Sequence, residues 1–194
     1  KTKNKKYLEA VEKLLLSISS KGIYDHLEGG VSRYTVDDKW IVPHFEKMLY
    51  DNIQYVNLLN NYLNLKENNY LKNKLKQTIN FINSEFVSKN NLLGSAYDAD
   101  SDGIEGKYYV WSDQELRKAL ETDYDFFAKY FDVSENGNWE GKNILVEKSI
   151  KLTIDESKKL KEIKNKLLAI REQRILPFFD DKTQIDLNSY WLST

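Results

Sequence analysis

Apolar residues recur at helical spacing in three long segments of the first half of the chain, and the segments differ in how many helix faces these residues cover. The segment from about residue 8 to 18 has one apolar stripe, formed by Leu8, Val11, Leu14, Leu15 and Ile18. The segment from about 68 to 88 also has one stripe, formed by Leu71, Leu75, Ile79, Ile82 and Phe86. Between them, residues 44 to 65 carry apolar or aromatic bulk on nearly every face, which predicts a helix buried all round. Alternating outer and inner antiparallel helices are what a toroid of helical hairpins requires, whereas a plain bundle favours more uniform helices.

Glycine and proline set the expected ends of these helices. Gly22 is placed to end the first helix, because glycine accepts the left-handed conformation that follows a helix C-terminus. Gly29 and Gly30 mark a loop, and residues 31–42 are expected to form a short extended excursion. Pro43 is predicted to be the first residue of the buried helix, where its missing N–H costs nothing.

The second half of the chain combines strand and helix signals. Residues 92–97 and 106–111 are expected to pair as a β-hairpin. Ser112 to Glu115 and Thr153 to Glu156 each match the capping box that opens a helix, and the two helices are expected to reach about Leu120 and Ile175. Residues 123–130 predict another short helix, and residues 180–194 a loop leading into a further one.

Composition excludes several classes of function. Lys and Arg total 29 against 30 Asp and Glu, so the net charge of -1 leaves no electrostatic footprint for nucleic acid or an anionic membrane. No run approaches the roughly 18 apolar residues of a membrane-spanning helix. The absence of cysteine excludes disulfides, Cys-ligated zinc and thiol catalysis, and it is compatible with a cytoplasmic address. The chain begins at Lys1 rather than Met, and we therefore expect a fragment that is inactive alone.

Candidate chemistry concentrates in residues 29–52, where aromatic, apolar and ionisable residues alternate rapidly. On the predicted helix, His44, Lys47 and Asp51 share one stripe, and Glu46 and Tyr50 form the neighbouring one. A histidine beside a carboxylate and a lysine could move protons to or from a sugar. The alternative is that these charges form ion pairs between crowded helices.

Other features leave further readings open. His26 is the other histidine, and hence the one available partner for His44 in a two-histidine proton exchange. Residues 98–103 imitate the first half of a calcium-binding EF-hand loop, but Tyr109 stands where the bidentate glutamate would be. This acidic loop could instead line a cleft, supply paired glycosidase carboxylates or be solvated. Aromatic residues at or beside loops could stack on sugar rings or pack internally: Tyr24, Tyr34, Trp40, Tyr97, Trp111 and Trp139.

Several of these stretches together carry a resemblance to a known family. The matching residues are Gly29-Gly30, Arg33 to Asp37, Trp40 to Asn52, Tyr97 to Ser101, Glu105 to Trp111, Gly137 to Gly141, Arg171, Arg174, Pro177 and Asp180 to Lys182. In this order and spacing they are very similar to the signature of the spermatogenesis-associated, thioredoxin-domain-containing family. The similarity runs collinearly across nearly the whole chain.

The resemblance implies an (α/α)6 toroid of the six-hairpin glycosidase type, related to N-acylglucosamine 2-epimerases. Full-length members place a thioredoxin-like domain before it, and the CxxC motif of that domain has no counterpart in this cysteine-free chain. We therefore expect an all-α fold: a partial (α/α)6 toroid in one domain, residues 1–194, with short β-hairpin excursions in the loops. Exposed toroid faces would favour self-association.

The leading functional hypothesis is a carbohydrate-active protein, namely a sugar epimerase or isomerase that uses neither cofactor nor metal. The catalytic candidates are His44, Asp51 and Glu46. The substrate-binding candidates are Arg33, Tyr34, Trp40, Lys47, Tyr50, Asp98 and Asp100. A carbohydrate ligand is expected, and neither nucleic acid nor membrane. The alternatives are a non-catalytic binding or scaffold module serving a thioredoxin-like domain, and a glycoside hydrolase-like activity.

Overall fold

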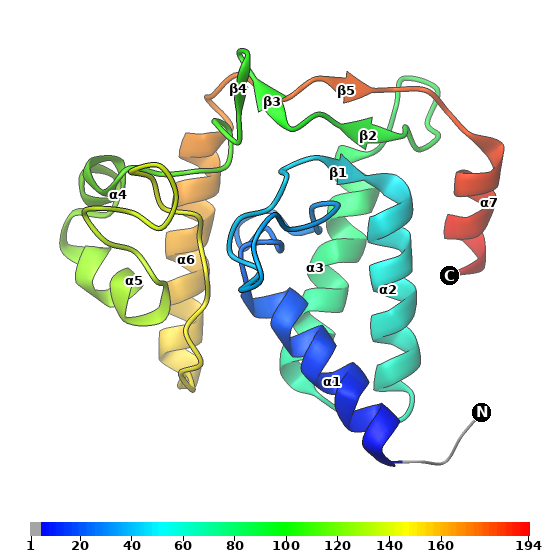
Figure 1. Ribbon diagram of the computed structural model, residues 1–194, viewed down its shortest axis with the longest axis horizontal. Coiled ribbons are helices and arrows are strands. Elements are labelled where there is room, and N and C mark those ends of the chain that lie inside the picture. Colours follow the sequence, from blue (N-terminus) through cyan, green and yellow to red (C-terminus); the bar gives the residue numbers. More distant parts are fainter. Residues whose placement is uncertain (1–4) are drawn as a thin grey trace.

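The computed structural model describes residues 5–194 and is mostly helical, with small antiparallel sheets (Figure 1). Helices α1 (Lys5–Ser20), α2 (Leu49–Leu63) and α3 (Asn69–Glu85) lie together on one side. Helices α4 (Asp113–Leu120), α5 (Tyr124–Tyr130) and α6 (Ile154–Arg171) lie on the other, and a 3-10 turn (Glu121–Asp123) joins α4 to α5. The last helix, α7 (Ile185–Ser193), packs against α2. None of the helices among residues 5–194 combines the length and apolarity needed to cross a lipid bilayer.

Helix α2 is the most enclosed of the long helices, as its sequence predicts. Its neighbours are α1, α3 and α7, and it buries residues on several faces, among them Asn52, Tyr55 and Leu59. The Tyr55 hydroxyl lies 2.6 Å from the Ser19 hydroxyl of α1, so its polar end is satisfied inside the core. Helices α1 and α3 bury one face each.

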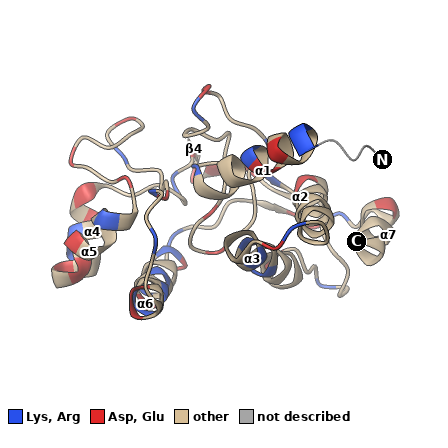
Figure 2. Ribbon diagram, turned by 90° about the horizontal axis from the view of Figure 1, so that it is seen from below, with Lys and Arg blue, Asp and Glu red and all other residues tan. Residues whose placement is uncertain are grey.

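Local capping signals place the helices of the second half correctly. Ser112 and Glu115 satisfy each other's backbone N–H groups at the start of α4, and Thr153 and Glu156 do the same at α6. Helix α6 ends at Arg171, one turn earlier than expected. Lys and Arg are interspersed with Asp and Glu along α1, α4 and α6, in keeping with the near-neutral chain (Figure 2).

The start of α2 differs from the prediction. Residues 43–48 are not helical: they follow an irregular extended path with a tight turn at Phe45, and α2 begins at Leu49. Residues 33–36 run antiparallel to residues 42–46 through backbone hydrogen bonds, such as His44 N–H to the carbonyl of Tyr34 at 3.0 Å. Phe45 has a φ of 62°, which a right-handed helix does not allow. The long-range backbone pairing therefore prevails over the local proline signal.

Two short sheets link distant parts of the chain above the helices. Strand β2 (Ala96–Tyr97) lies between β1 (Lys47–Met48) and β5 (Phe179–Asp180), and β3 (Asp100–Ser101) pairs with β4 (Ile104–Glu105). The predicted pairing of residues 92–97 with 106–111 is therefore wrong. Asp102 and Gly103 both have positive φ, as a tight hairpin turn requires, so the hairpin closes within residues 100–105. This hairpin also replaces the helix–loop geometry of an EF-hand.

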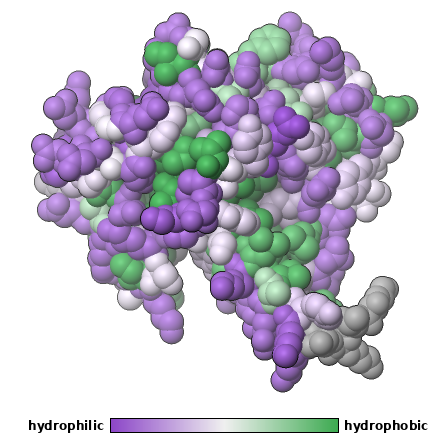
Figure 3. Space-filling model, viewed as in Figure 1, coloured by the Kyte–Doolittle hydropathy of each residue, from purple (hydrophilic) through white to green (hydrophobic). Residues whose placement is uncertain are grey.

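The buried side chains form four hydrophobic clusters. Within residues 5–194, one joins α4, α5 and α6, a second joins α1, α2 and α3, a third joins α2, α3 and α7, and a small one surrounds Phe45. Outside these clusters the surface visible in Figure 3 is mostly hydrophilic, with hydrophobic residues exposed at separate places. The Phe45 cluster packs beneath residues 43–48, which belong to the segment that the sequence singles out.

Candidate functional site

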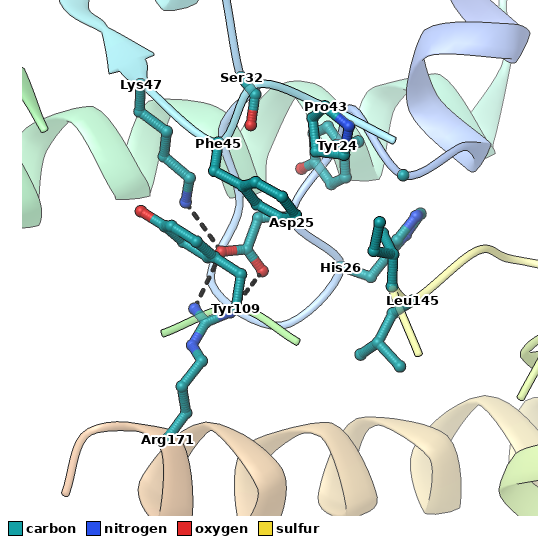
Figure 4. A pocket seen from close by; sticks show the side chains of 12 residues that line it. Tyr24, Asp25, His26, Ser32, Pro43, Phe45, Lys47, Tyr109, Leu145 and Arg171 are labelled. Atoms are coloured by element: carbon teal, nitrogen blue, oxygen red, sulfur yellow. Dashed lines mark hydrogen bonds and ion pairs between the residues drawn. The ribbon is translucent and has the colours of Figure 1, made fainter. Parts of the chain in front are cut away.

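Residues 43–50 alternate strictly between two faces. Pro43, Phe45, Lys47 and Leu49 are buried, while His44, Glu46, Met48 and Tyr50 are half-buried. Before α2 begins at Leu49, this period of two indicates a segment that places alternate side chains on the core, as an extended chain does, although Phe45 itself lies in a turn. In Figure 4, Pro43, Phe45 and Lys47 line the interior cavity. The predicted helical stripe of His44, Lys47 and Asp51 is therefore wrong, because His44 and Lys47 lie on opposite faces.

Lys47 is the centre of a buried ionic network. Its Nζ donates to Asp25 Oδ2 at 2.8 Å and to the carbonyl of Gly29 at 3.1 Å, and lies 3.6 Å from Glu28 Oε2. Arg171, at the end of α6, donates to Asp25 Oδ1 at 2.9 Å (Figure 4). It also donates to Glu28 Oε2 at 3.0 Å. The network joins α6 to β1 and to the loop after α1.

The two carboxyl groups of this network respond differently to burial. Burial acts to raise the pKa of Asp25, but the attraction of Arg171 and Lys47 outweighs it and holds that pKa well below its usual value. For Glu28, burial outweighs the attraction of Lys47 and Arg171, and the pKa is raised. Asp25 therefore stays ionised and is the anionic partner of both Lys47 and Arg171.

The cavity beside this network has a volume of about 30 Å³. Its walls include Tyr24, Asp25, His26, Phe45 and Lys47 (Figure 4). A water molecule needs roughly 10–15 Å³, so the cavity has room for about two and none for a sugar ring. The substrate-binding role predicted for Lys47 has no support in this placement, which is that of a structural ion pair.

A second buried cluster surrounds His26, away from His44. The imidazole Nε2 faces the carbonyl of Lys21 at 3.0 Å, and Nδ1 lies 3.1 Å from both Lys74 Nζ and Glu147 Oε1. Burial and the charge of Lys74 lower the pKa of His26. In its neutral form Nε2–H donates to Lys21 and Nδ1 accepts from Lys74. The two histidines have separate partners, so the predicted exchange between them has no structural support.

His44 faces the opposite way and pairs with Glu105. Its Nδ1 lies 2.9 Å from Glu105 Oε1 of β4, and about a third of the imidazole side chain remains exposed. The ring stacks on Tyr34, with centroids 4.8 Å apart and planes 15° from parallel. A carboxylate and an aromatic face thus fix the imidazole, while solvent can still reach it.

The outward face continues with Arg33, Glu46, Tyr50 and Asp51. Arg33 Nη1 donates to Glu46 Oε2 at 3.1 Å. Burial raises the pKa of Asp51 to about 6, opposed by Arg33 and assisted by Glu46. Asp51 Oδ2 is buried and has no hydrogen-bond partner within residues 5–194. The guanidinium of Arg33 thus interacts electrostatically with Glu46, Tyr50 and Asp51.

Three predicted substrate-binding residues have other surroundings. Trp40 has a φ of 62°, and its carbonyl accepts a hydrogen bond from Gly22. Asp98 is exposed and accepts from the N–H of Ala99. Asp100 is exposed and pairs in register with Glu105. In the described part of the chain, no three His, Asp or Glu side chains converge as metal ligands would.

A larger cavity of about 580 Å³ opens beside Glu105. It is bounded by the β3–β4 hairpin and the residues after it, by residues 139–142, and by residues 173–175 after α6. Glu105 lines this cavity and also pairs with His44, whose own side chain is not part of the lining. The volume is in the range of small-molecule sites.

Sequence reasoning missed Glu105, Glu115, Glu140, Gln173 and Arg174 as cavity residues. Glu105 and Arg174 belong to the stretches that resemble the family, which was the one available signal. Glu115 was recognised for its capping role alone. Glu140 also belongs to a stretch that resembles the family, Gly137 to Gly141, whereas for Gln173 the sequence carries no signal, because its convergence with the other residues depends on long-range pairing.

Comparison with known proteins agrees with the resemblance. The chain is 30% identical to an uncharacterized protein of Caenorhabditis elegans over 93% of its length, and 28% identical to human spermatogenesis-associated protein 20 over 92%. The chain is a distant homologue of spermatogenesis-associated protein 20. The mouse protein of that name is 30% identical over 72% of the chain. The chain spans less than a third of these relatives, 29%, 27% and 21% of their lengths. No family model matches it.

Proposed function

We propose that this chain is part of a helical toroid that acts on carbohydrates by proton transfer, as in sugar epimerisation or isomerisation. His44 exchanges the proton with the substrate, and Glu105 orients the imidazole. The long helices α1, α2 and α3 supply the alternating outer and inner positions that such a toroid needs.

The observation that carries the proposal is the His44–Glu105 pair. Its 2.9 Å separation, the Tyr34 stack and the partly open imidazole meet the requirements of a positioned acid–base group. The 580 Å³ cavity beside Glu105 supplies space for a substrate. His26 meets neither requirement, because it is 1% exposed and adjoins the 30 Å³ cavity.

The remaining outward residues have supporting roles in this proposal. Arg33, held by Glu46, presents a cation on the same face of the chain as His44 and can orient a hydroxyl group. Asp51 and Tyr50 surround Arg33 from α2. Lys47 is left out, because its ammonium is fully engaged inside the core.

A second function, a non-catalytic scaffold or binding module, is favoured by the buried network. Asp25, Lys47 and Arg171 all lie in stretches shared with the family or next to them, and they join β1 to α6 instead of facing a ligand. Under this alternative, the family signature preserves a framework for another part of a longer protein. A thioredoxin-like domain is the partner that the resemblance implies.

Proton exchange distinguishes the two functions. The product of the complete gene and the 194-residue chain are incubated with a panel of aldoses and ketoses in D₂O, and deuterium incorporation at carbon is followed by NMR. We expect exchange with the complete product, a loss of about 10²–10⁴-fold in His44→Gln, and a smaller loss in Glu105→Gln. Glu172→Gln, an exposed glutamate after α6, is the matched control. Exchange that survives His44→Gln contradicts the assigned role, and neither binding nor exchange with any sugar favours the scaffold.

A further inference from the structure

We infer that the 580 Å³ cavity is a subsite for an uncharged sugar ring, which stacks on Trp139. This inference rests on the proposed function and adds where the substrate lies and what charge it carries. The cavity has an apolar part, formed by Ile104, Val110, Trp139 and Ile175, and charged groups around it. That combination is typical of small-molecule sites, where apolar walls provide contact and a few polar groups provide orientation.

Trp139 is held in a fixed position at the cavity wall. Its indole packs on Phe45, with ring centroids 5.2 Å apart, and its backbone forms an antiparallel bridge with Lys142 through hydrogen bonds of 3.0 and 2.7 Å. The neighbouring Asn138 side chain bonds both the N–H and the carbonyl of Ile144 at 2.8 Å. A preorganised aromatic face loses little conformational entropy when a ligand stacks on it.

The same packing ties Trp139 to the acid–base residue. Phe45 is the chain neighbour of His44, and a Cβ added at Gly106 would lie 2.6 Å from the Phe45 ring. Residues 44–45 therefore lie against residues 105–106, and Trp139 lies against Phe45. A ring stacked on Trp139 would be close to Glu105, whose carboxylate holds His44.

The charges of the cavity balance. Three carboxylates, Glu105, Glu115 and Glu140, face three cations, Lys107, Lys142 and Arg174. A site for a sugar phosphate or a sugar acid needs a surplus of cations, which this lining does not supply.

Most of the cations are also engaged elsewhere. Arg174 donates to the carbonyls of Tyr108 at 2.9 Å and Val110 at 2.7 Å, and lies 3.4 Å from Glu115. Lys107 Nζ lies 2.7 Å from Asp102 Oδ2. Arg174 and Lys107 are thus unavailable as free phosphate ligands.

The groups beside Trp139 remain available. The carboxylate of Glu140 and the ammonium of Lys142 have no hydrogen bond or ion pair within residues 5–194, and the charge of Lys142 contributes to lowering the pKa of Glu115, which burial opposes. One acceptor and one donor in a lining that also contains an aromatic ring suit the hydroxyl groups of a neutral sugar ring. A neutral ring is therefore the ligand that this lining fits best.

Calorimetric titration of the 194-residue chain with methyl glucoside, methyl galactoside and glucose 6-phosphate tests the inference. We expect saturable binding of at least one neutral glycoside and no tighter binding of the phosphate. Trp139→Ala should weaken binding about tenfold or more. Because Trp139→Ala also removes a contact with Phe45, Gln173→Arg is the second variant: it places a larger side chain in the cavity from an exposed position and should weaken binding without changing the core.

The control is Trp191→Phe, which changes a tryptophan of α7 that bonds Asn83. Binding by this variant should equal that of the unmodified chain, because the Trp191 side chain does not line the cavity. Neutral glycosides that bind both Trp139→Ala and Gln173→Arg normally, or a phosphate that binds more tightly than they do, would overturn the inference. The same holds if no neutral glycoside binds at all. Binding that persists without proton exchange would overturn the proposed reaction and leave the subsite standing.

Discussion

The ammonium of Lys47 lies 2.8 Å from Asp25 Oδ2, and both side chains are almost completely buried. Isolated charges in such surroundings would each cost several kcal/mol. Here each has more than one partner, because Lys47 also donates to Gly29 and Asp25 also accepts from Arg171. The pair therefore joins three segments that are distant in sequence, and its removal should affect the whole fold.

We predict that Lys47→Met lowers the free energy of unfolding by about 3–5 kcal/mol, because it leaves buried carboxyl groups with one cation fewer. Urea denaturation followed by circular dichroism measures the change. Lys182→Met is the control: the Lys182 side chain is 81% exposed and lies 3.5 Å from Asp180. That variant should change the free energy by less than about 1 kcal/mol. Equal effects in the two variants would contradict a structural role for the buried pair.

Gly30 and Gly103 form a matched pair for a test of packing. Both have positive φ, 81° and 70°. A Cβ at Gly30 would lie 2.5 Å from the Phe81 ring and 2.9 Å from Asn52 Oδ1, whereas a Cβ at Gly103 would meet nothing within 4 Å. We expect Gly103→Ala to cost about 1–2 kcal/mol for the backbone alone, and Gly30→Ala about 1–3 kcal/mol more for the clash. Thermal melts of the two variants give the difference, and similar melting temperatures would contradict this packing.

Asp51 should make the free energy of unfolding fall as pH rises, whereas most carboxyl groups make it rise. Its pKa in the folded protein is about 6, above the ordinary 3.8, so folding favours the neutral form. The stabilisation is full below pH 3.8 and is lost as pH rises through 6. Asp51→Asn should therefore stabilise the protein at pH 8 by about 1 kcal/mol, allowing for solvent screening of this half-buried group, and by nothing near pH 3.5.

Asp102 supplies the control for that measurement. Its pKa is lowered by the hydrogen bond and charge of Lys107, so Asp102→Asn should lose a little stability at pH 8 rather than gain it. Urea titrations at the two pH values separate the two signs. A loss of stability in Asp51→Asn at pH 8 would show that Asp51 has an ionic partner.

His26 should titrate below its ordinary pKa of 6.5, because burial and the neighbouring Lys74 disfavour its protonation. The folded protein favours neutral imidazole, so this contribution to stability is full above pH 6.5 and falls as pH drops towards the lower folded pKa. Nitrogen chemical shifts measured by NMR should show the Nε2–H tautomer at neutral pH, consistent with the Lys21 carbonyl at 3.0 Å. A His26 pKa above 6.5 would mean that Glu147 outweighs Lys74.

Local signals in the sequence were sufficient for much of the fold. The capping boxes at Ser112 and Thr153 and the apolar stripes of α1 and α3 depend on residues within a few positions of each other, and they are confirmed. The predicted start of α2 is wrong, because Pro43 and His44 pair with residues 34–35. The spacing of apolar residues along the chain does not reveal such pairing.

The candidate site was harder to predict from the sequence, because its geometry also depends on pairing between separate segments. The sequence singles out His44 and Lys47 as candidates, but the faces on which they lie depend on a backbone path whose partner strand is two residues long. Glu105, the partner of His44, lies 61 residues away in the chain. The large cavity is assembled from three segments between residues 101 and 175, and no spacing in the sequence shows that they meet.

The alternation of residues 43–50 has a consequence for insertions and deletions. Adding or removing one residue there would exchange the faces, turning Lys47 towards solvent and an acidic neighbour towards Asp25. Such a change would eliminate the internal ion pair and the exposed histidine together, although no existing side chain had been altered. The segment should therefore tolerate substitutions on its outer face far better than any change in its length.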